Sequence, residues 1–262
     1  RHTRYISVTG VQTCALPDLQ NKTLVEILSH HKWDCDKDPN CGNKKYPGHT
    51  YLEIYDRLFK VYQHENINVL EIGILRGTSM RLWAEYFSNA TIWGMDTFER
   101  NWVGCSFEEV TNTLDDISDR TKLVKVNSCS TQQEDQEARL EILNNIPDGF
   151  FHIIIDDGSH EIQDQIGTYK NFKSKLNKDG IYIIEDIGIT NSAPISPRLL
   201  IKSLPKFKLI DMRYPGKIDN AIAIYMNNNS KHYQHHNGYY KSKHWTVAKE
   251  FTYDYIIKKQ QE

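Results

Sequence analysis

Two short apolar runs, each closed by acidic residues, constrain the fold of this chain more than any other feature. Residues 151–155 precede the cluster Asp156-Asp157-Gly158-Ser159-His160, and residues 181–184 precede Glu185-Asp186. Isoleucine-rich runs of this length are typical of strands buried on both faces of a parallel sheet. If the two strands are neighbours, their ends lie about 4.8 Å apart. The carboxylates would then repel one another unless a cation, a bound substrate or neutralising partners are present, so we expect the function at this rim.

The rest of the chain alternates between helical and extended patterns. Helices are predicted at 19–31, 51–64, 79–87, 106–117, 132–143, 162–176 and 197–204. Further strands are predicted at 67–72, 91–95, 122–126, 207–212 and 221–226. The last two are separated only by a Pro-Gly loop, which demands antiparallel pairing. The pattern therefore predicts an α/β fold with a Rossmann-like, seven-stranded, mostly parallel sheet, helices on both faces and an antiparallel last strand.

Composition narrows the class of partner. A chain of 262 residues suits one large domain, or one domain with appendages. Its net charge of -2 gives no general attraction to nucleic acid or to anionic membranes, and no run approaches the roughly 18 apolar residues of a membrane span. The five scattered cysteines favour a reducing compartment. We expect a soluble, cytoplasmic protein whose partner is a small molecule, without nucleic-acid or membrane partners.

A glycine motif follows the first predicted strand. Gly73 and Gly77 allow a sharp turn and a close approach of the backbone to a ligand. Their G-x-x-x-G spacing is not the G-x-G-x-x-G of dinucleotide-binding folds, which argues against a nicotinamide dehydrogenase. The next strand ends in Asp96, whose carboxylate could accept both hydroxyls of a ribose or could instead cap the segment that follows it.

These motifs carry a resemblance to a known family. The E-x-G-x-x-x-G-x-S pattern, followed by an acidic second-strand end, resembles the class I S-adenosylmethionine-dependent methyltransferases. Residues 37–186, with His49-x-Tyr51, LEIGILRGTSMRLW, IIIDDGSH and GIYIIEDI, are similar to the macrolide-sugar and rhamnosyl O-methyltransferases of the mycinamicin and tetracenomycin pathways. The pair IDDGSH and IED is the specific part of this similarity. The same stretch also resembles the cephalosporin hydroxylase group.

The resemblance implies roles for individual residues. The cofactor S-adenosylmethionine would be bound by Tyr51, Glu71, Gly73, Gly77, Ser79, Asp96, Asn127, Ser128 and Asp156, with Asn127 and Ser128 near the adenine. This third loop lacks the commoner Gly-Asp pairing. Asp157, Glu185 and Asp186 would hold Mg²⁺ or Mn²⁺, and His160 would be the base, with Asp157 beside it in the catalytic pair.

The chemistry supports these roles independently. A sugar hydroxyl is a poor nucleophile until it loses its proton, and an imidazole with a pKa of about 6.5 can accept that proton near neutral pH. Oxygen ligands favour Mg²⁺ or Mn²⁺ over zinc, whereas a site in which His160 is also a ligand could bind iron. Because three positions separate Asp157 from His160, one helical turn could place both on the same side of the pocket.

Several features also have a purely structural interpretation. Ser159 could be the N-cap of a helix, and either acidic cluster alone could be structural. Tyr51 could be a core aromatic residue instead of a cofactor contact. Cys35 and Cys41 could form a metal clip with nearby histidines and aspartates, but their spacing is unusual for zinc, so a solvated loop is expected at 32–50.

The predicted organisation has four parts. Residues 1–17 form a non-native or disordered leader, 18–66 the N-terminal helices and a cofactor-covering loop, 67–228 the methyltransferase catalytic domain and 229–262 a polar tail. We predict a metal-assisted O-methyltransferase acting on a sugar or a small glycosylated metabolite, in a homo-oligomer. The alternatives are a hydroxylase of the same fold, which requires iron, and a non-catalytic S-adenosylmethionine-binding module.

Overall fold

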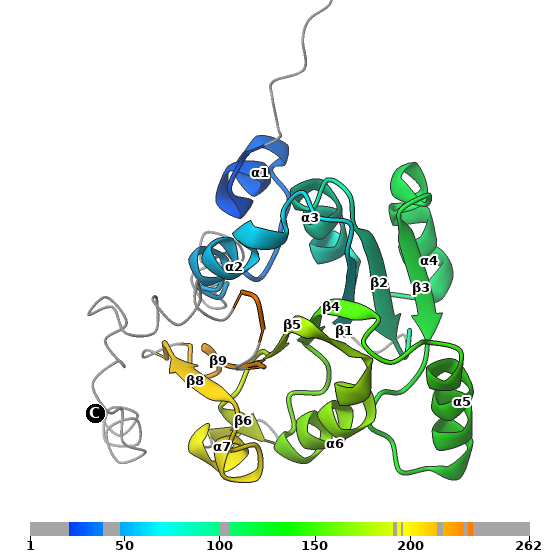
Figure 1. Ribbon diagram of the computed structural model, residues 1–262, viewed down its shortest axis with the longest axis vertical. Coiled ribbons are helices and arrows are strands. Elements are labelled where there is room, and N and C mark those ends of the chain that lie inside the picture. Colours follow the sequence, from blue (N-terminus) through cyan, green and yellow to red (C-terminus); the bar gives the residue numbers. More distant parts are fainter. Residues whose placement is uncertain are drawn as a thin grey trace, which may run out of the picture.

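The computed structural model describes residues 21–38, 48–99, 105–190, 193–194, 196–213, 217–227 and 230–232. The predicted leader and all but three residues of the predicted tail lie outside this part of the chain. Its centre is a seven-stranded sheet in the order β3-β2-β1-β4-β5-β9-β8 (Figure 1). The strands are β1 (Asn68–Ile72), β2 (Thr91–Asp96), β3 (Thr121–Lys125), β4 (Phe151–Asp156), β5 (Leu176–Ile184), β8 (Lys208–Asp211) and β9 (Ala221–Met226).

The pairing confirms the predicted fold class. Strands β3, β2, β1, β4 and β5 are parallel, and β9 runs antiparallel to both β5 and β8. A second, two-stranded sheet pairs β6 (Ile189–Thr190) with β7 (Ala193–Pro194). The fold is therefore a Rossmann-like mixed sheet whose last strand is antiparallel, as the alternating sequence pattern predicts.

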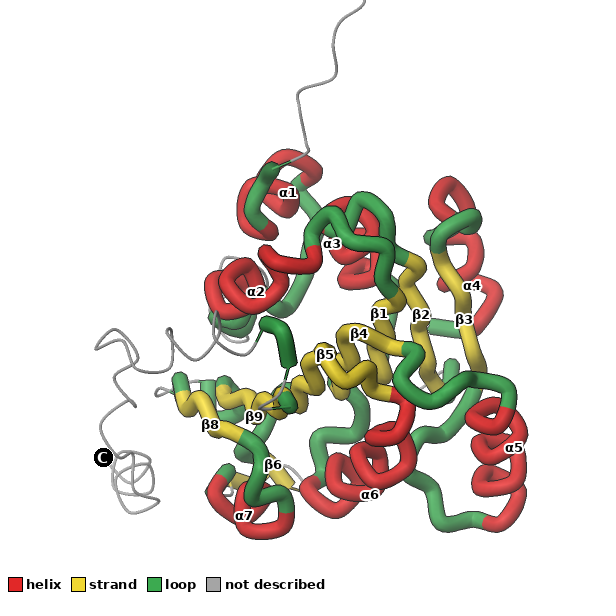
Figure 2. The backbone as a smooth tube through the Cα atoms, in the orientation of Figure 1, coloured by secondary structure: helices red, strands yellow, loops and turns green. Residues whose placement is uncertain are grey.

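Helices cover both faces of the sheet, which Figure 2 shows in cross-section. They are α1 (Leu24–His31), α2 (Leu52–Phe59), α3 (Thr78–Tyr86), α4 (Phe107–Thr113), α5 (Gln133–Asn144), α6 (Ile162–Phe172) and α7 (Arg198–Ser203), with 3₁₀ turns at Lys60–Tyr62, Asp115–Ile117 and Lys173–Lys175. Alternate strand residues point to opposite faces. Ile153 and Ile155 thus pack with α1 to α4, whereas Ile154 packs with α5 to α7.

Several predicted boundaries are wrong. Helix α1 begins after Thr23, because the Thr23 hydroxyl accepts from the Glu26 backbone in a capping box. The helix predicted at 51–64 ends at Phe59 and continues only as a 3₁₀ turn. Strand β5 begins at Leu176, within the predicted helix. The prediction missed its first half because that half is polar and lacks the apolar pattern of a buried strand.

The register places the acidic clusters together. Ile72 of β1 lies opposite Asp156 of β4, and Asp156 lies opposite Ile184 of β5. The segments that follow these three strands therefore leave the sheet at one edge. The order β2-β1-β4-β5 places the reversal of strand order between β1 and β4, which is where α/β sheets bind ligands. Within the described residues, every helix is too short or too polar to cross a membrane.

Candidate functional site

A cleft of about 1260 Å³ opens at this edge of the sheet. Of the residues predicted to bind cofactor, metal or proton, the cleft is lined by Gly73, Ser79, Asp96, Asn127, Ser128, Asp157, His160 and Asp186. Five predicted residues lie outside its lining, namely Tyr51, Glu71, Gly77, Asp156 and Glu185. The structure thus brings most of the predicted site residues into a single space and places the others beneath its surface.

Gly73 is where the loops after β1 and β4 meet. Its φ is +82°, and a Cβ atom at this position would lie 2.0 Å from the carbonyl oxygen of Asp157. Asp157 in turn donates its N–H to the Ile72 carbonyl over 2.8 Å. Only glycine accepts both this backbone conformation and this close approach. Gly77, with a φ of +79°, begins α3 and lies against side chains only.

Asp96 holds the glycine loop in place. Its Oδ2 accepts from the N–H groups of Ile74 at 2.9 Å and Leu75 at 3.3 Å, and its Oδ1 accepts from Phe98 at 2.9 Å. The structure therefore shows the capping role that was the alternative for this residue. A carboxylate offers about four acceptor positions, so Asp96, which also lines the cleft, retains room for one more donor.

The loop after β3 is shaped by its own side chains. Asn127 Oδ1 accepts from the backbone of Cys129 at 3.2 Å and Ser130 at 2.9 Å, which forms a turn. The buried Arg139 donates to the Asn127 carbonyl at 2.8 Å. Ser128 pairs its hydroxyl with that of Thr168. Both predicted adenine-side residues line the cleft, but the side chain of Asn127 is occupied in shaping the loop.

Glu71 lies under the cleft, completely buried. Its Oε2 accepts from the Ser79 hydroxyl at 2.6 Å and from the Trp83 indole at 3.1 Å. Its Oε1 lies 3.4 Å from the ammonium of Lys37. Burial raises the pKa of Glu71, and the nearby Lys37 acts in the opposite direction.

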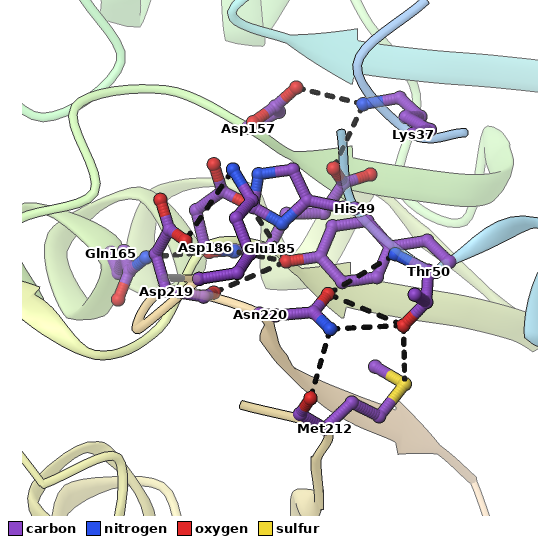
Figure 3. A network of polar contacts seen from close by, with 12 residues as sticks. Lys37, His49, Thr50, Asp157, Gln165, Glu185, Asp186, Met212, Asp219 and Asn220 are labelled. Carbon is purple, nitrogen blue, oxygen red and sulfur yellow. Dashed lines mark hydrogen bonds and ion pairs between the residues drawn. The ribbon is translucent and has the colours of Figure 1, made fainter. Parts of the chain in front are cut away.

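Lys37 is the cation that the acidic rim requires. Its side chain is fully buried, and its Nζ lies 2.8 Å from Asp157 Oδ2 and 2.8 Å from Glu185 Oε2 (Figure 3). Tyr55 donates its hydroxyl to the other oxygen of Glu185 at 2.5 Å. Burial alone would lower the pKa of Lys37, but Asp157, Glu185 and Glu71 raise it well above its usual value.

One ammonium does not neutralise three carboxylates. Burial raises the pKa of Asp157 to about 7 although Lys37 opposes this effect. It likewise raises the pKa of Glu185 well above its ordinary value. Lys37 alone therefore does not offset the ionised forms of all three carboxyls, so bound protons or a further cation must offset the remaining negative charge.

Asp186 has its own partners. Its Oδ1 accepts from the Tyr51 hydroxyl at 2.7 Å and lies 3.2 Å from His49 Nε2. Burial acts to raise the pKa of Asp186, but His49 and its hydrogen bond hold that pKa far below the usual range. Tyr51 is completely buried, as a core aromatic residue would be, and its predicted contact with the cofactor stays a prediction. Asp186 itself adopts a φ of +53°.

Two groups of side chains in the described residues are close enough to hold a cation. Asp157, His160 and Asp186 form one, and His49, Asp186 and Asp219 form the other, with ligand atoms within 4.8 Å of one another in each. Glu185 is in neither group, and its two oxygens instead contact Lys37 and Tyr55. The three predicted metal ligands are thus divided in this structure: Asp157 and Asp186 share a group, and Glu185 does not.

His160 reaches this group by a route that differs from the prediction. Residues 157–161 are not helical, so no helical turn connects Asp157 to His160. His160 instead lies in a loop and has a left-handed φ of +62°. The N-cap of α6 is Glu161, not Ser159. The Nδ1 of His160 is buried without a hydrogen-bond partner. Burial acts to lower the pKa of His160, but Asp186, Asp157 and Asp156 outweigh it and raise that pKa.

Asp156 is buried beneath the rim. It is 2% exposed, its Oδ2 has no hydrogen-bond partner, and burial raises its pKa to about 7. The predicted contact of Asp156 with the cofactor's amino-acid portion stays a prediction.

Sequence reasoning missed Lys37 and Tyr55, and it gave neither His49 nor Asp219 a part in a cation site. The described part of the segment 32–50 is a loop, as expected, but it is only partly solvated, because Cys35, Lys37 and Asp38 are buried. Cys41 lies outside the described residues, and Cys35 is in neither cation group. The available signal was the excess of acid at the rim, which calls for a neutralising partner but does not say which lysine supplies it.

Known proteins with similar sequences are sugar O-methyltransferases. The chain is 25% identical over 153 residues to the 8-demethyl-8-alpha-L-rhamnosyl tetracenomycin-C 2'-O-methyltransferase of Streptomyces olivaceus, covering 56% of this chain and 35% of that one. It is 29% identical over 146 residues to the demethylmacrocin O-methyltransferase of Streptomyces fradiae, covering 53% and 32%. The chain thus spans about a third of the length of these relatives. No protein-family model matches it.

Solved structures agree with the fold. The MycE methyltransferase from the mycinamycin biosynthetic pathway, in complex with Mg, SAH and mycinamycin VI, superposes with a TM-score of 0.50 at 21% identity, covering 80% of this chain and 55% of that one. A second crystal form of MycE with Mg and SAH gives a TM-score of 0.51 at 22% identity, with coverages of 80% and 55%. The similarity that the motifs indicate is therefore confirmed: about half of the chain is similar in sequence to sugar O-methyltransferases, and the structure has a Rossmann-like methyltransferase fold.

Proposed function

We propose that this chain is an S-adenosylmethionine-dependent O-methyltransferase that acts on a hydroxyl group of a sugar or a small glycosylated metabolite, assisted by Mg²⁺ or Mn²⁺. The observation that carries the proposal is a single cleft with two chemically different ends. The Gly73 loop and Asp96, which follow β1 and end β2, line what we call the cofactor end. Asp157, His160 and Asp186, which follow β4 and β5, gather at what we call the acidic end. A methyl donor and a proton acceptor can thus serve the same bound hydroxyl.

The names of the relatives support the class of acceptor. They describe methylation of a rhamnosyl tetracenomycin and of demethylmacrocin. The cleft supports it too, because its volume of about 1260 Å³ exceeds the ~300–1,000 Å³ of a pocket for one small ligand. There is room for a nucleoside-containing donor and a sugar-bearing acceptor side by side.

The residues present fit both bound groups. At the cofactor end, Gly73 lines the cleft, and Asp96 has acceptor capacity for a ribose hydroxyl. At the acidic end, Asp157 and Asp186 offer the oxygen ligands that Mg²⁺ and Mn²⁺ prefer, and His160 lies close enough to them to act on a hydroxyl bound there. Asp186 suits this role because its low pKa keeps it ionised at neutral pH.

The chemistry of the protein itself is proton transfer and positioning. When bound, the divalent cation would act as a Lewis acid on the acceptor hydroxyl, and S-adenosylmethionine would supply the methyl group. His160 accepts the hydroxyl proton at its imidazole in the neutral form, while Asp157 and Asp186 stabilise the imidazolium that results. The Gly73 loop and Asp96 hold the donor in line with the acceptor.

The test is methyl transfer from labelled S-adenosylmethionine to a panel of glycosides with free hydroxyls, with Mg²⁺, with Mn²⁺ and with a chelator. We expect methylated glycoside that is formed only with a divalent cation. Consumption of oxygen with iron, without methyl transfer, would instead identify the hydroxylase of the same fold. Binding of S-adenosylmethionine without turnover on any acceptor would identify the non-catalytic module.

A further inference from the structure

Lys37 lies where the acidic rim needs positive charge. The side chain is 0% exposed, and its Nζ contacts Asp157 and Glu185 at 2.8 Å each and Glu71 at 3.4 Å. An ammonium has three donors, and here a carboxylate faces each of them. A cation built into the chain therefore takes oxygens from two of the three residues that the sequence motifs assign to a divalent metal.

A metal ion that bound the same carboxylate oxygens as Lys37 would weaken the contacts of the lysine. Mg²⁺ binds oxygen ligands at about 2.0–2.1 Å and takes their lone pairs, and Lys37 already binds Asp157 Oδ2 and Glu185 Oε2. In addition, two positive ions a few Å apart in a buried site repel each other strongly. Glu185 is outside both candidate cation groups while Lys37 is in place.

Lys37 is also tied to the segment that carries other site residues. Its carbonyl oxygen accepts from the N–H of Tyr51 at 3.3 Å, and the carbonyl of its neighbour Asp36 accepts from the N–H of His49. His49 and Tyr51 both bind Asp186 (Figure 3). A displacement of Lys37 therefore disturbs the backbone bonds that place these two partners of Asp186.

We propose that Lys37 is a positioning residue that competes with the divalent cation for Asp157 and keeps Glu185 out of the metal site until its ammonium withdraws. The inference rests on the proposed metal-assisted function. It makes the predicted trio of Asp157, Glu185 and Asp186 a second state of the rim, formed when metal replaces the ammonium. Metal binding is then coupled to the backbone around residues 36–38 and 48–51.

The test compares Mn²⁺ affinity by calorimetry and electron paramagnetic resonance, with S-adenosylhomocysteine present. We expect Lys37→Met to bind Mn²⁺ at least about tenfold more tightly than the wild type, because a competing charge has gone. Lys37→Arg keeps the charge and should stay close to the wild type. Lys175→Met is the matched control, since it removes a partly buried lysine that pairs with Asp148 away from the cleft.

Hydrogen exchange in the wild type tests the same coupling without a variant. Saturating Mn²⁺ should speed exchange of the Tyr51 amide, which donates to the Lys37 carbonyl, and of the Asp38 amide, which donates to Cys35. Unchanged exchange at these amides overturns the inference, as does equal or weaker Mn²⁺ binding by a folded Lys37→Met variant.

A merely structural lysine would lower the melting temperature without tightening Mn²⁺ binding. Absence of Mn²⁺ binding in every form would overturn the proposed metal-assisted function as well, whereas equal binding overturns the lysine's role alone.

Discussion

The two ends of the cleft are built by different means. At the cofactor end, Asp96 accepts backbone N–H groups from a loop about twenty residues before it, and the sheet holds both segments. At the acidic end, Lys37 joins Asp157 and Glu185 across separations of 120 and 148 residues. The first end depends on local backbone geometry, and the second depends on a balance of charges that distant segments supply. Ions should therefore alter the acidic end far more than the cofactor end.

The largest expected effect separates the two ends by activity. His160→Asn removes the imidazole but keeps a residue that tolerates the left-handed φ of +62° at this position. We expect kcat to fall by about 10²–10⁴-fold because general-base catalysis is lost, whereas S-adenosylhomocysteine binds as before. Methyl transfer and calorimetry measure the two quantities. His64→Asn, at an exposed residue that follows the 3₁₀ turn Lys60–Tyr62, should change neither quantity. Unchanged turnover in His160→Asn would remove His160 from the mechanism.

The second prediction concerns the one point where the two ends touch. In Gly73→Ala, the new Cβ would lie 2.0 Å from the Asp157 carbonyl at a φ of +82°, so backbone must move. We expect a loss of about 3 kcal/mol or more in the free energy of unfolding, together with weaker Mn²⁺ binding, because Asp157 shifts. Denaturant unfolding and calorimetry test this.

Gly77→Ala provides the matched control for that substitution. Its φ of +79° imposes the same backbone strain, but the nearest atom to its Cβ is the Val110 side chain at 3.2 Å, which can adjust. The strain alone should cost about 1–2 kcal/mol and leave Mn²⁺ affinity unchanged. If both variants lose equal stability, the contact between Gly73 and Asp157 is not what joins the two ends.

A smaller effect is expected at the cofactor end alone. Asp96→Asn loses the charge of a carboxylate that lines the cleft and holds the glycine loop. Since hydrogen bonds to charged groups contribute about 1.5–3 kcal/mol, S-adenosylhomocysteine should bind at least tenfold more weakly, with Mn²⁺ affinity unchanged. Glu99→Gln, an exposed residue that also lines the cleft, is the control. Equal weakening in both variants would indicate a general charge effect and not a contact of Asp96.

The contrast between the ends also explains what sequence could predict. The fold followed from residues such as Ile153 to Ile155, because an isoleucine-rich run followed by turn residues has few alternatives to a buried parallel strand. Gly73 and Asp96 were found for the same reason, since their roles depend on strand ends that lie near each other in sequence. Strand β5 was predicted too short where its first half is polar.

The acidic end was predictable only in part. Asp157, His160 and Asp186 belong to motifs, and the register of β4 and β5 brings them together. Lys37 belongs to a polar segment with several lysines, and no periodicity distinguishes the buried one. Glu185 and Asp186 have different partners, and Asp186 has a positive φ, a backbone state that apolar patterning does not reveal.

The smallest effect concerns α1 and α2, the helices before and after the Lys37 segment in the sequence. Asp56 on α2 accepts the Leu24 N–H over 2.8 Å and so ties α2 to α1. Burial raises the pKa of Asp56 to about 6, above the ordinary value of 3.8. The folded protein therefore holds this proton more tightly than the unfolded chain does. The contribution of Asp56 to stability is fully present below about pH 4 and is lost as the pH rises through about 6.

Asp56→Asn should remove that loss without touching either end of the cleft. Asparagine cannot ionise, and its carbonyl oxygen still accepts the Leu24 N–H. After allowance for solvent screening at this partly exposed group, we expect the variant to be about 1 kcal/mol more stable at pH 7 and nearly equal to the wild type at pH 4. Urea unfolding across this range measures the difference. Because α1 and α2 flank the Lys37 segment, unchanged affinities for S-adenosylhomocysteine and Mn²⁺ would show that the acidic end responds to charge at the rim itself and not to the stability of the helices around it.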